Sequence, residues 1–264
     1  NLFIIKFNLI KLHRIIYIYI LIMNTKGFRL IFFFSLFSLF SFGQIDKRFS
    51  VLHLTGQSNY FFNNKLKYNL IPKVADSFDS MRIAALSEGI EIKIVSSYRS
   101  FDHQKNIWNR KFLKNDSIGL QIDENIKKIM EYSTIPGTSR HHWGTDIDIV
   151  DGSQIVDGDV LVTQKFYGQG PYVRLRKWLE KNAQKFGFYV VYTKNKKRNG
   201  FNYEPWHYSY APISIEILNS FLEINIEKII KSNGIFGATN FDSNFIEFYK
   251  KNYILGINPY LKVK

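Results

Sequence analysis

Histidine and aspartate residues gather in one short stretch of the chain. Residues 133–151 read STIPGTSRHHWGTDIDIVD, where two adjacent histidines, the first of them His141, precede Asp146 and Asp148. Imidazole and carboxylate groups brought to one point are the usual protein ligands of zinc. A packed core has no use for so many polar groups, so the stretch predicts a metal centre.

The local backbone is expected to bring these groups together. Side chains alternate along a strand, so in TDIDIV (145–150) Asp146 and Asp148 share one face while the isoleucines take the core face. Gly144 has the conformational freedom for a turn that returns the imidazole of His141 over the strand.

A second polar cluster, YEPWH at 203–207, lies far along the chain. Glu204 precedes a proline, which disfavours helical geometry, so we expect a loop that enters a strand and not the helical HExxH motif. A hydrolytic zinc site typically has three ligands, an open position for water and a separate carboxylate that takes the proton. His141, Asp148 and His207 can be the ligands, and Glu204 the base. A lone histidine is more often a structural or surface residue, which is our interpretation of His13, His53, His103 and His142.

Helices and short strands alternate around these motifs. Helices are predicted at 72–88, from Ser100 through 112, from Asp123 through 130, and at 172–186 before Gly187. Strands are predicted at 91–95, 145–150, 188–192 and 206–210. No repeat or long linker interrupts the pattern, which is typical of a single α+β domain with a small, mostly antiparallel sheet and flanking helices.

The first 43 residues are expected to be absent from the mature protein. Residues 1–22 are an apolar, basic stretch before the first methionine, and we interpret them as an upstream leader. Residues 23–43 combine two basic residues with an apolar run and small residues, which predicts a signal peptide cleaved between Gly43 and Gln44. The alternative is a retained membrane anchor. The mature domain, residues 44–264, is then exported to the periplasm or cell envelope.

Composition limits the classes of function. The chain of 264 residues is 45% hydrophobic and 22% charged, as expected for a globular domain with its own core. It has no cysteine, which excludes disulfides, thiolate metal ligands and a cysteine nucleophile. The net charge of +14 falls to +9 without residues 1–43, so the mature protein stays basic. This charge favours loose association with anionic envelope surfaces over a nucleic-acid partner. The densest basic run, KNKKR at 194–198, is expected to be a solvated hairpin loop.

Three segments resemble motifs of the zinc D-alanyl-D-alanine carboxypeptidases of the VanY and VanX type, relatives of the lysostaphin-type and hedgehog folds. SRHHWGTDID (139–148) resembles their Ser-x-His-x-x-Gly-x-x-x-Asp motif, and EPWH (204–207) their Glu-x-x-His motif. SSYRSFDHQ (96–104) resembles their Ser-x-Tyr-Arg-Ser-x-x-x-Gln segment. The resemblance runs from about Leu54 to the IFGATN stretch at 235–240.

The resemblance implies a hedgehog/DD-peptidase-like fold and one zinc ion per chain. By position in the motifs, His141, Asp148 and His207 would bind the zinc, and Glu204 would be the catalytic acid/base.

Three further residues receive roles from the same resemblance. Arg99 would polarise the scissile carbonyl, and Ser139 and Gln104 would line the substrate site. One departure is Asp146, where many family members have alanine. Since it shares a strand face with Asp148, we expect it to accept the free ring N–H of a ligand histidine or to meet a cationic group of the substrate. The alternative is a solvated carboxylate at a strand edge.

The function expected from the resemblance is removal of terminal D-alanine from peptidoglycan stem peptides by metal-activated water. One alternative is an L,D-carboxypeptidase, and another is an endopeptidase that cuts wall cross-links in a more open groove. A third is a non-catalytic, zinc-stabilised wall-binding module, which has no need of the proton-transfer carboxylate Glu204. A serine mechanism is disfavoured because the chain has no Ser-x-x-Lys or Lys-Thr-Gly motif.

Overall fold

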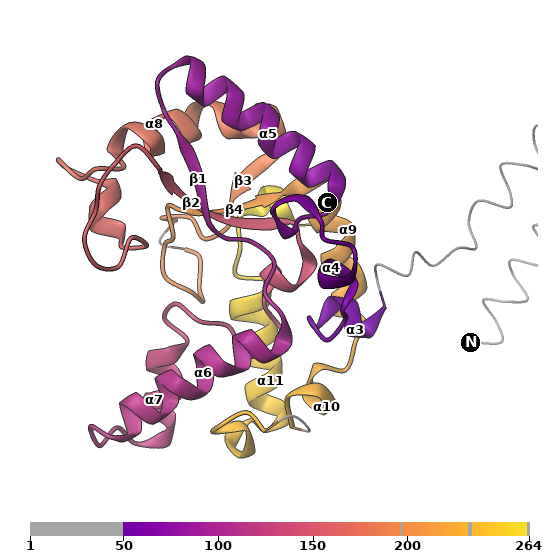
Figure 1. Ribbon diagram of the computed structural model, residues 1–264. Helices are drawn as coiled ribbons and strands as arrows, with labels where there is room; N and C mark the ends of the chain where they lie inside the picture. Colours follow the sequence, from indigo (N-terminus) through magenta and orange to yellow (C-terminus); the bar gives the residue numbers. More distant parts are fainter. Residues whose placement is uncertain (1–49, 196, 232–233, 263–264) are drawn as a thin grey trace, which may run out of the picture. The chain divides into compact units, whose positions relative to one another are not determined.

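A four-stranded antiparallel sheet carries the polar motifs in the computed structural model, which describes residues 50–195, 197–231 and 234–262 (Figure 1). The strands, in chain order, are β1 (Ile92–Ser96), β2 (Asp146–Asp151), β3 (Phe188–Val190) and β4 (His207–Tyr210). Their order in the sheet is β1-β2-β4-β3. All six residues of β2 are buried, and neighbouring strands flank it on both sides. The predicted α+β class and antiparallel sheet are confirmed.

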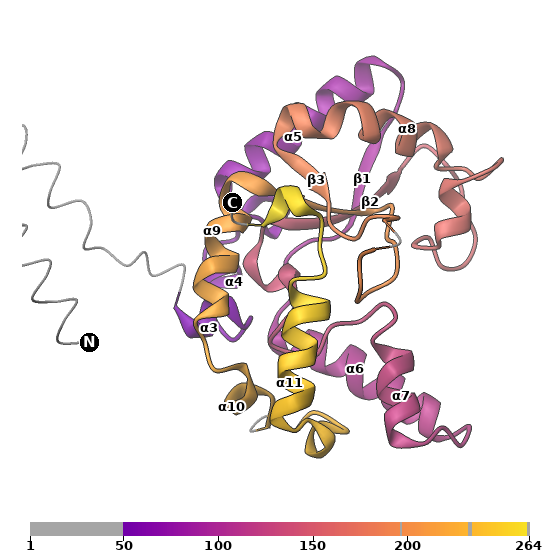
Figure 2. The same ribbon diagram turned by 180° about the vertical axis from the view of Figure 1, so that it is seen from behind.

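Helices pack on both sides of this sheet (Figures 1 and 2). On one side lie α5 (Pro72–Ser87) and α8 (Val173–Asn182). On the other side lie α6 (Phe101–Asp116), α7 (Ile122–Ile129) and α11 (Ser243–Tyr249). The remaining α-helices described are α3 (Val51–Leu54), α4 (Tyr60–Asn63), α9 (Ala211–Leu222) and α10 (Ile226–Lys231). None of the helices that the structure describes is long and apolar enough to cross a bilayer.

Several predicted helix ends are confirmed, and two differ. The Ser100 hydroxyl accepts a hydrogen bond from the backbone N–H of His103 at 3.2 Å and caps α6, as predicted. Asp123 does not cap α7 but lies in its first turn, where a carboxylate complements the positive end of the helix dipole. The helix predicted at 172–186 ends earlier, and a 3₁₀ turn continues to Gly187, which takes a left-handed conformation.

Helices α3 and α11 contact the loop at residues 133–144, which we call the motif loop. The indole N–H of Trp143 donates to the carbonyl oxygen of Leu54 in α3 at 3.1 Å. At the other end, the Tyr249 hydroxyl in α11 lies 2.8 Å from the Thr138 hydroxyl and accepts the backbone N–H of Ile135 at 3.2 Å. The loop that leads to the histidines is therefore fastened from both sides.

The basic run at 194–198 belongs to the connection between β3 and β4. Lys194 is exposed, in agreement with a solvated loop. Arg198 differs, because it is half-buried and its guanidinium donates to four backbone carbonyls, those of Thr193, Asn199, Phe201 and Gly256. The expectation of a wholly solvated loop is wrong for this residue, which ties the connection to the C-terminal segment. The predicted leader (1–22) and signal peptide (23–43) lie outside the described residues.

Candidate active site

Strand register brings the predicted metal ligands together. On β2, Asp148 pairs with Ser96 of β1 and with His207 of β4. His141 approaches from the preceding loop, and its Nε2 lies 3.3 Å from Asp148 Oδ2. One donor atom from each of His141, Asp148 and His207 lies within 4.8 Å of the others, and all three residues are buried. The structure therefore assembles the three residues that the sequence analysis selected.

A short 3₁₀ turn, Arg140–Trp143, orients His141. The Ser139 hydroxyl accepts the backbone N–H of His141 at 3.3 Å and caps this turn. The turn ends at Gly144 with φ +67°, and a Cβ atom at that position would collide with the ring of Phe61. Only glycine fits both the conformation and the space, as the sequence predicted.

The second ring nitrogen of each histidine is also engaged. His141 Nδ1 lies 2.7 Å from the carbonyl oxygen of Ser97, so Nδ1 carries the proton and Nε2 is free to bind a metal. His207 Nε2 lies 3.1 Å from Asp146 Oδ2, while its Nδ1 lies 2.9 Å from Glu204 Oε2. Donation from Nε2 to Asp146 leaves Nδ1 as the nitrogen of His207 that can bind a metal.

Charged neighbours shift the pKa of two of the candidate ligands. Burial alone would raise the pKa of Asp148, but His141, His207 and Arg99 outweigh burial and lower it to about 2. Burial tends to lower the pKa of His207, yet hydrogen bonds to Asp146 and Glu204 raise it to about 10. The two carboxylates therefore stabilise positive charge on the His207 ring.

Asp146 is fully buried, so the alternative of a solvated edge carboxylate is wrong. Besides His207, it accepts a hydrogen bond from Arg140 Nε at 2.9 Å and from the Ser209 hydroxyl at 2.7 Å. Burial opposes ionisation of this carboxylate, but Arg140 and His207 hold its pKa well below the usual range. The expected role as acceptor for the ring N–H of a ligand histidine agrees with this geometry.

Sequence reasoning missed Arg140. Its Nε donates to Asp146 and its Nη2 to the Ser209 hydroxyl at 2.7 Å, and its guanidinium carbon lies 4.6 Å from the Trp143 ring centroid. The side chain is 5% exposed, so the pair with Asp146 is a buried ion pair. The sequence did contain one indication of this ion pair. Arg140 directly precedes the candidate ligand His141, and the same motif carries Asp146 where many family members have alanine.

Arg99 lies next to the three candidate metal ligands, and its guanidinium has three polar neighbours. Its Nη1 donates to Gln104 Oε1 at 2.8 Å, its Nη2 donates to the Ser96 hydroxyl at 2.9 Å, and Nη2 lies 3.8 Å from Asp148 Oδ2. Gln104 in turn donates to the carbonyl oxygen of Thr134 at 2.9 Å. Gln104 is thus placed behind Arg99 and positions it, and is not among the residues that line the pocket.

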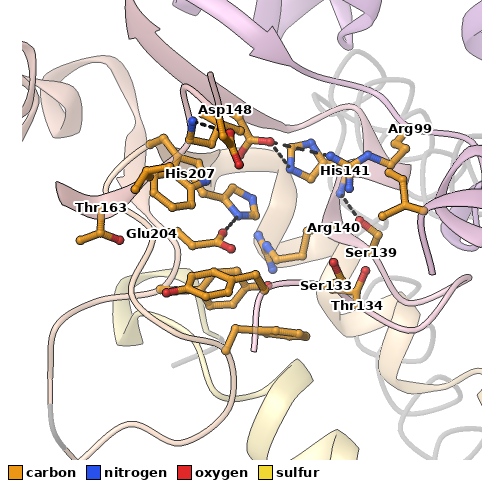
Figure 3. Close-up of a pocket in the computed structure, with 18 of the residues that line it drawn as sticks. Arg99, Ser133, Thr134, Ser139, Arg140, His141, Asp148, Thr163, Glu204 and His207 are labelled. Carbon is orange, nitrogen blue, oxygen red and sulfur yellow. Dashed lines mark hydrogen bonds and ion pairs between the residues drawn. The ribbon is translucent and has the colours of Figure 1, made fainter. Parts of the chain in front are cut away.

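A pocket of about 450 Å³ opens over these groups (Figure 3). Figure 3 labels the predicted residues in its wall, among them Arg99, Ser139, His141, Asp148 and Glu204. His207 also lines it. Side chains from the SSYRS, SRHHWGTDID and EPWH segments therefore line one cavity.

The adjacent histidine, His142, is structural as interpreted. It is fully buried, its Nδ1 donates to the carbonyl oxygen of Arg99 at 2.6 Å, and its Nε2 accepts the backbone N–H of Gly137 at 3.1 Å. Burial lowers its pKa to about 3, so it remains neutral. His53 and His103 also lie outside the pocket lining, and His13 is outside the described residues.

The chain belongs to the VanY family of D-alanyl-D-alanine carboxypeptidases, whose family model matches residues 67–213. This match spans all the motifs described above, from Arg99 to His207.

The chain is also similar to individual proteins. The putative carboxypeptidase YodJ of Bacillus subtilis is 33% identical over 154 residues, which cover 58% of this chain and 50% of that protein. A D-alanyl-D-alanine carboxypeptidase of Enterococcus faecalis is 27% identical over 151 residues, which cover 56% of this chain and 49% of that protein. A D,D-pentapeptidase VanY from a VanB-type resistance cassette, solved in complex with Zn(II), is 22% identical with a TM-score of 0.45, covering 58% of this chain and 79% of that one. The chain spans about half the length of the curated relatives it matches.

Replacing Asp146 with alanine is expected to weaken metal binding. The change removes the acceptor for His207 Nε2 and leaves the buried guanidinium of Arg140 without its carboxylate. Loss of a partner that orients a metal ligand typically costs about 10- to 100-fold in affinity. Zinc affinity measured by chelator competition tests this, with Asp151→Ala as control, because Asp151 lies on the same strand outside the pocket lining. Equal affinities of the two variants would refute the role.

Proposed function

We propose that this chain is a zinc-dependent D-alanyl-D-alanine carboxypeptidase that acts on peptidoglycan stem peptides. The observation that carries the proposal is the convergence of His141, Asp148 and His207 with the separate carboxylate of Glu204 on one pocket. Three ligands beside an independent proton acceptor are the composition of a hydrolytic zinc site and not of a closed structural one. Membership of the VanY family supports the same activity.

The residues fit zinc. Two imidazoles and one carboxylate form a donor set that zinc favours, and their donor atoms converge at one buried place. His141 Nε2, Asp148 and His207 Nδ1 would hold the ion. When bound, zinc supplies a Lewis acid that activates water at neutral pH.

Glu204 is suited to move the proton. Its carboxylate is buried at the pocket wall, and burial raises its pKa even though His207 opposes this effect. A raised pKa brings the group closer to the operating pH, where it can both accept and release a proton. Glu204 would take the proton from the attacking water and pass it to the nitrogen of the departing D-alanine.

Arg99 would stabilise the negative charge that develops on the scissile carbonyl oxygen. Arg99→Ala is therefore expected to lower turnover by about 10²- to 10³-fold while bound zinc is unchanged. Lysine at this position should restore only part of the rate, because a point charge does not reproduce the planar fork of donors. Turnover and zinc content are measured on the same preparations, and a wild-type rate for Arg99→Ala would leave Arg99 without a catalytic role.

One experiment separates the proposed activity from its alternatives. The purified, zinc-loaded protein is incubated with muropeptides that carry pentapeptide or tetrapeptide stems, and with cross-linked dimers. Loss of one D-alanine from the pentapeptide alone supports the proposal. Loss from the tetrapeptide identifies an L,D-carboxypeptidase, cleavage of the dimers an endopeptidase, and binding without any cleavage a wall-binding module.

We also propose export to the cell envelope, where these substrates are found. The support is the apolar run followed by small residues at 23–43, together with the basic charge that remains after it. Mass spectrometry of the mature N-terminus tests the proposed cleavage after Gly43. A chain that starts at or before Met23 in the membrane fraction would indicate an anchor instead.

A further inference from the structure

One wall of the pocket carries a cation that the proposed reaction does not use. Lys111 in α6 lines the pocket and is half-buried, and its Nζ donates to the Ser133 hydroxyl at 2.6 Å. Within the described part of the chain, no carboxylate forms an ion pair with this ammonium group. Glu204 and Asp159 act on it only at longer range. A partly buried cation without a close anion is incompletely compensated and therefore favours binding of an anionic ligand.

Thr134 adds a second unused polar group to the same wall. Its hydroxyl oxygen is buried and has no hydrogen-bond partner among the described residues. The segment is not loose, because the backbone carbonyl of Thr134 accepts the Gln104 amide. In Figure 3, Ser133 and Thr134 lie beside Ser139, with Thr163 on the far side of the cavity.

We propose that Lys111 Nζ and the hydroxyls of Ser133 and Thr134 bind the C-terminal carboxylate of the stem peptide. The inference rests on the proposed function. An ammonium and two hydroxyls provide the donors that a carboxylate accepts, and a charge-assisted contact of this kind is stronger than one between neutral groups.

Both arginines that line the pocket are less available for this purpose. Arg140 forms a buried ion pair with Asp146 and donates to Ser209, so its charge is already compensated, although its Nη1 has no hydrogen-bond partner among the described residues. Arg99 already donates to Gln104 and Ser96 and lies close to Asp148, so its guanidinium is committed to the catalytic side of the pocket. Lys111 has one hydroxyl partner and retains further N–H donors.

This assignment makes Lys111 a specificity-determining residue. A carboxypeptidase substrate carries a free carboxylate one residue beyond the scissile bond, whereas the chain continues at that point in an endopeptidase substrate. Recognition of the carboxylate by Lys111 would favour the carboxypeptidase substrate. It would also place the scissile carbonyl at a fixed distance from the C-terminus of the stem peptide.

The test compares N-acetyl-L-Lys-D-Ala-D-Ala with the same peptide amidated at its C-terminus. The wild type is expected to cleave the acid in preference to the amide. Lys111→Met should lower kcat/KM for the acid by about 10- to 100-fold, as for loss of a hydrogen bond to a charged group, and should change the amide little. Thr134→Val should act in the same direction with a smaller effect, and Lys111→Arg should keep most of the preference. Lys114→Met is the matched control, because Lys114 lies one turn further along α6, is exposed and does not line the pocket.

Calorimetric binding of both peptides to zinc-loaded Glu204→Gln protein, with and without Lys111→Met, provides a readout independent of turnover. Selective loss of acid binding supports the site. Equal losses for acid and amide, or a wild type that does not discriminate between them, would overturn the site while the proposed function stands. A wild-type protein that neither cleaves nor binds either peptide would overturn both.

Discussion

Alanine at His141, Asp148 or His207 is expected to remove zinc and activity together. Each change leaves two of the three donors that converge within 4.8 Å, and no other described residue belongs to that cluster. The loss of zinc affinity should exceed the ~10- to 100-fold cost of removing a partner outside the ligand set. Elemental analysis of the purified variants and a turnover assay on the same samples measure both effects.

The control for the ligand variants is His103→Ala. His103 is exposed on α6 and does not line the pocket, so this variant should keep zinc and activity. Circular dichroism shows whether each ligand variant is folded. Near-stoichiometric zinc in all three folded variants would refute the proposed metal site.

Glu204→Ala should keep zinc and still lose activity by at least ~10²- to 10⁴-fold, as is typical for removal of a general acid/base. Glu204 is not one of the three clustered donors, and its carboxylate contacts His207 through a single hydrogen bond of 2.9 Å. Glu204→Gln retains the shape and a hydrogen-bonding group, so it tests the charge of this residue with less disturbance of His207.

Zinc content and turnover on the same Glu204 preparations decide the outcome. Full zinc with lost turnover separates proton transfer from metal binding. A Glu204→Ala protein with wild-type turnover would remove Glu204 from the mechanism and would favour a different proton acceptor.

The features that the sequence predicted well are determined by residues adjacent in the sequence. Alternation in TDIDIV placed Asp146 and Asp148 on one face and Ile147 and Ile149 on the other, and both isoleucines are fully buried. The left-handed turn at Gly144 follows from the lack of a side chain. The pairing of Asp148 with His207 was not visible in local patterns. Residue types made both of them candidate ligands, and the family resemblance assigned them to one site.

The residues that were missed act through contacts between distant segments. The Arg140 guanidinium, in the turn before β2, donates to Ser209 on β4, and local sequence patterns do not indicate such a pairing. The sequence gave only a weak indication that Lys111 lies near the site. It follows Gln104 by two helical turns and therefore lies on the same side of α6. Its contact with Ser133 depends on the path of the loop after α7, which periodicity does not determine.

The attachment of the motif loop to α3 and α11 affects how the protein should be divided for expression. Leu54 and Tyr249 both lie outside the matched segment 67–213, yet one anchors Trp143 and the other anchors Thr138. A shortened gene product limited to the matched segment would lack both anchors and would expose the aromatic surfaces that they cover. We therefore expect the smallest unit of this chain that folds by itself to extend beyond residues 67–213 and to include α11, which ends at Tyr249.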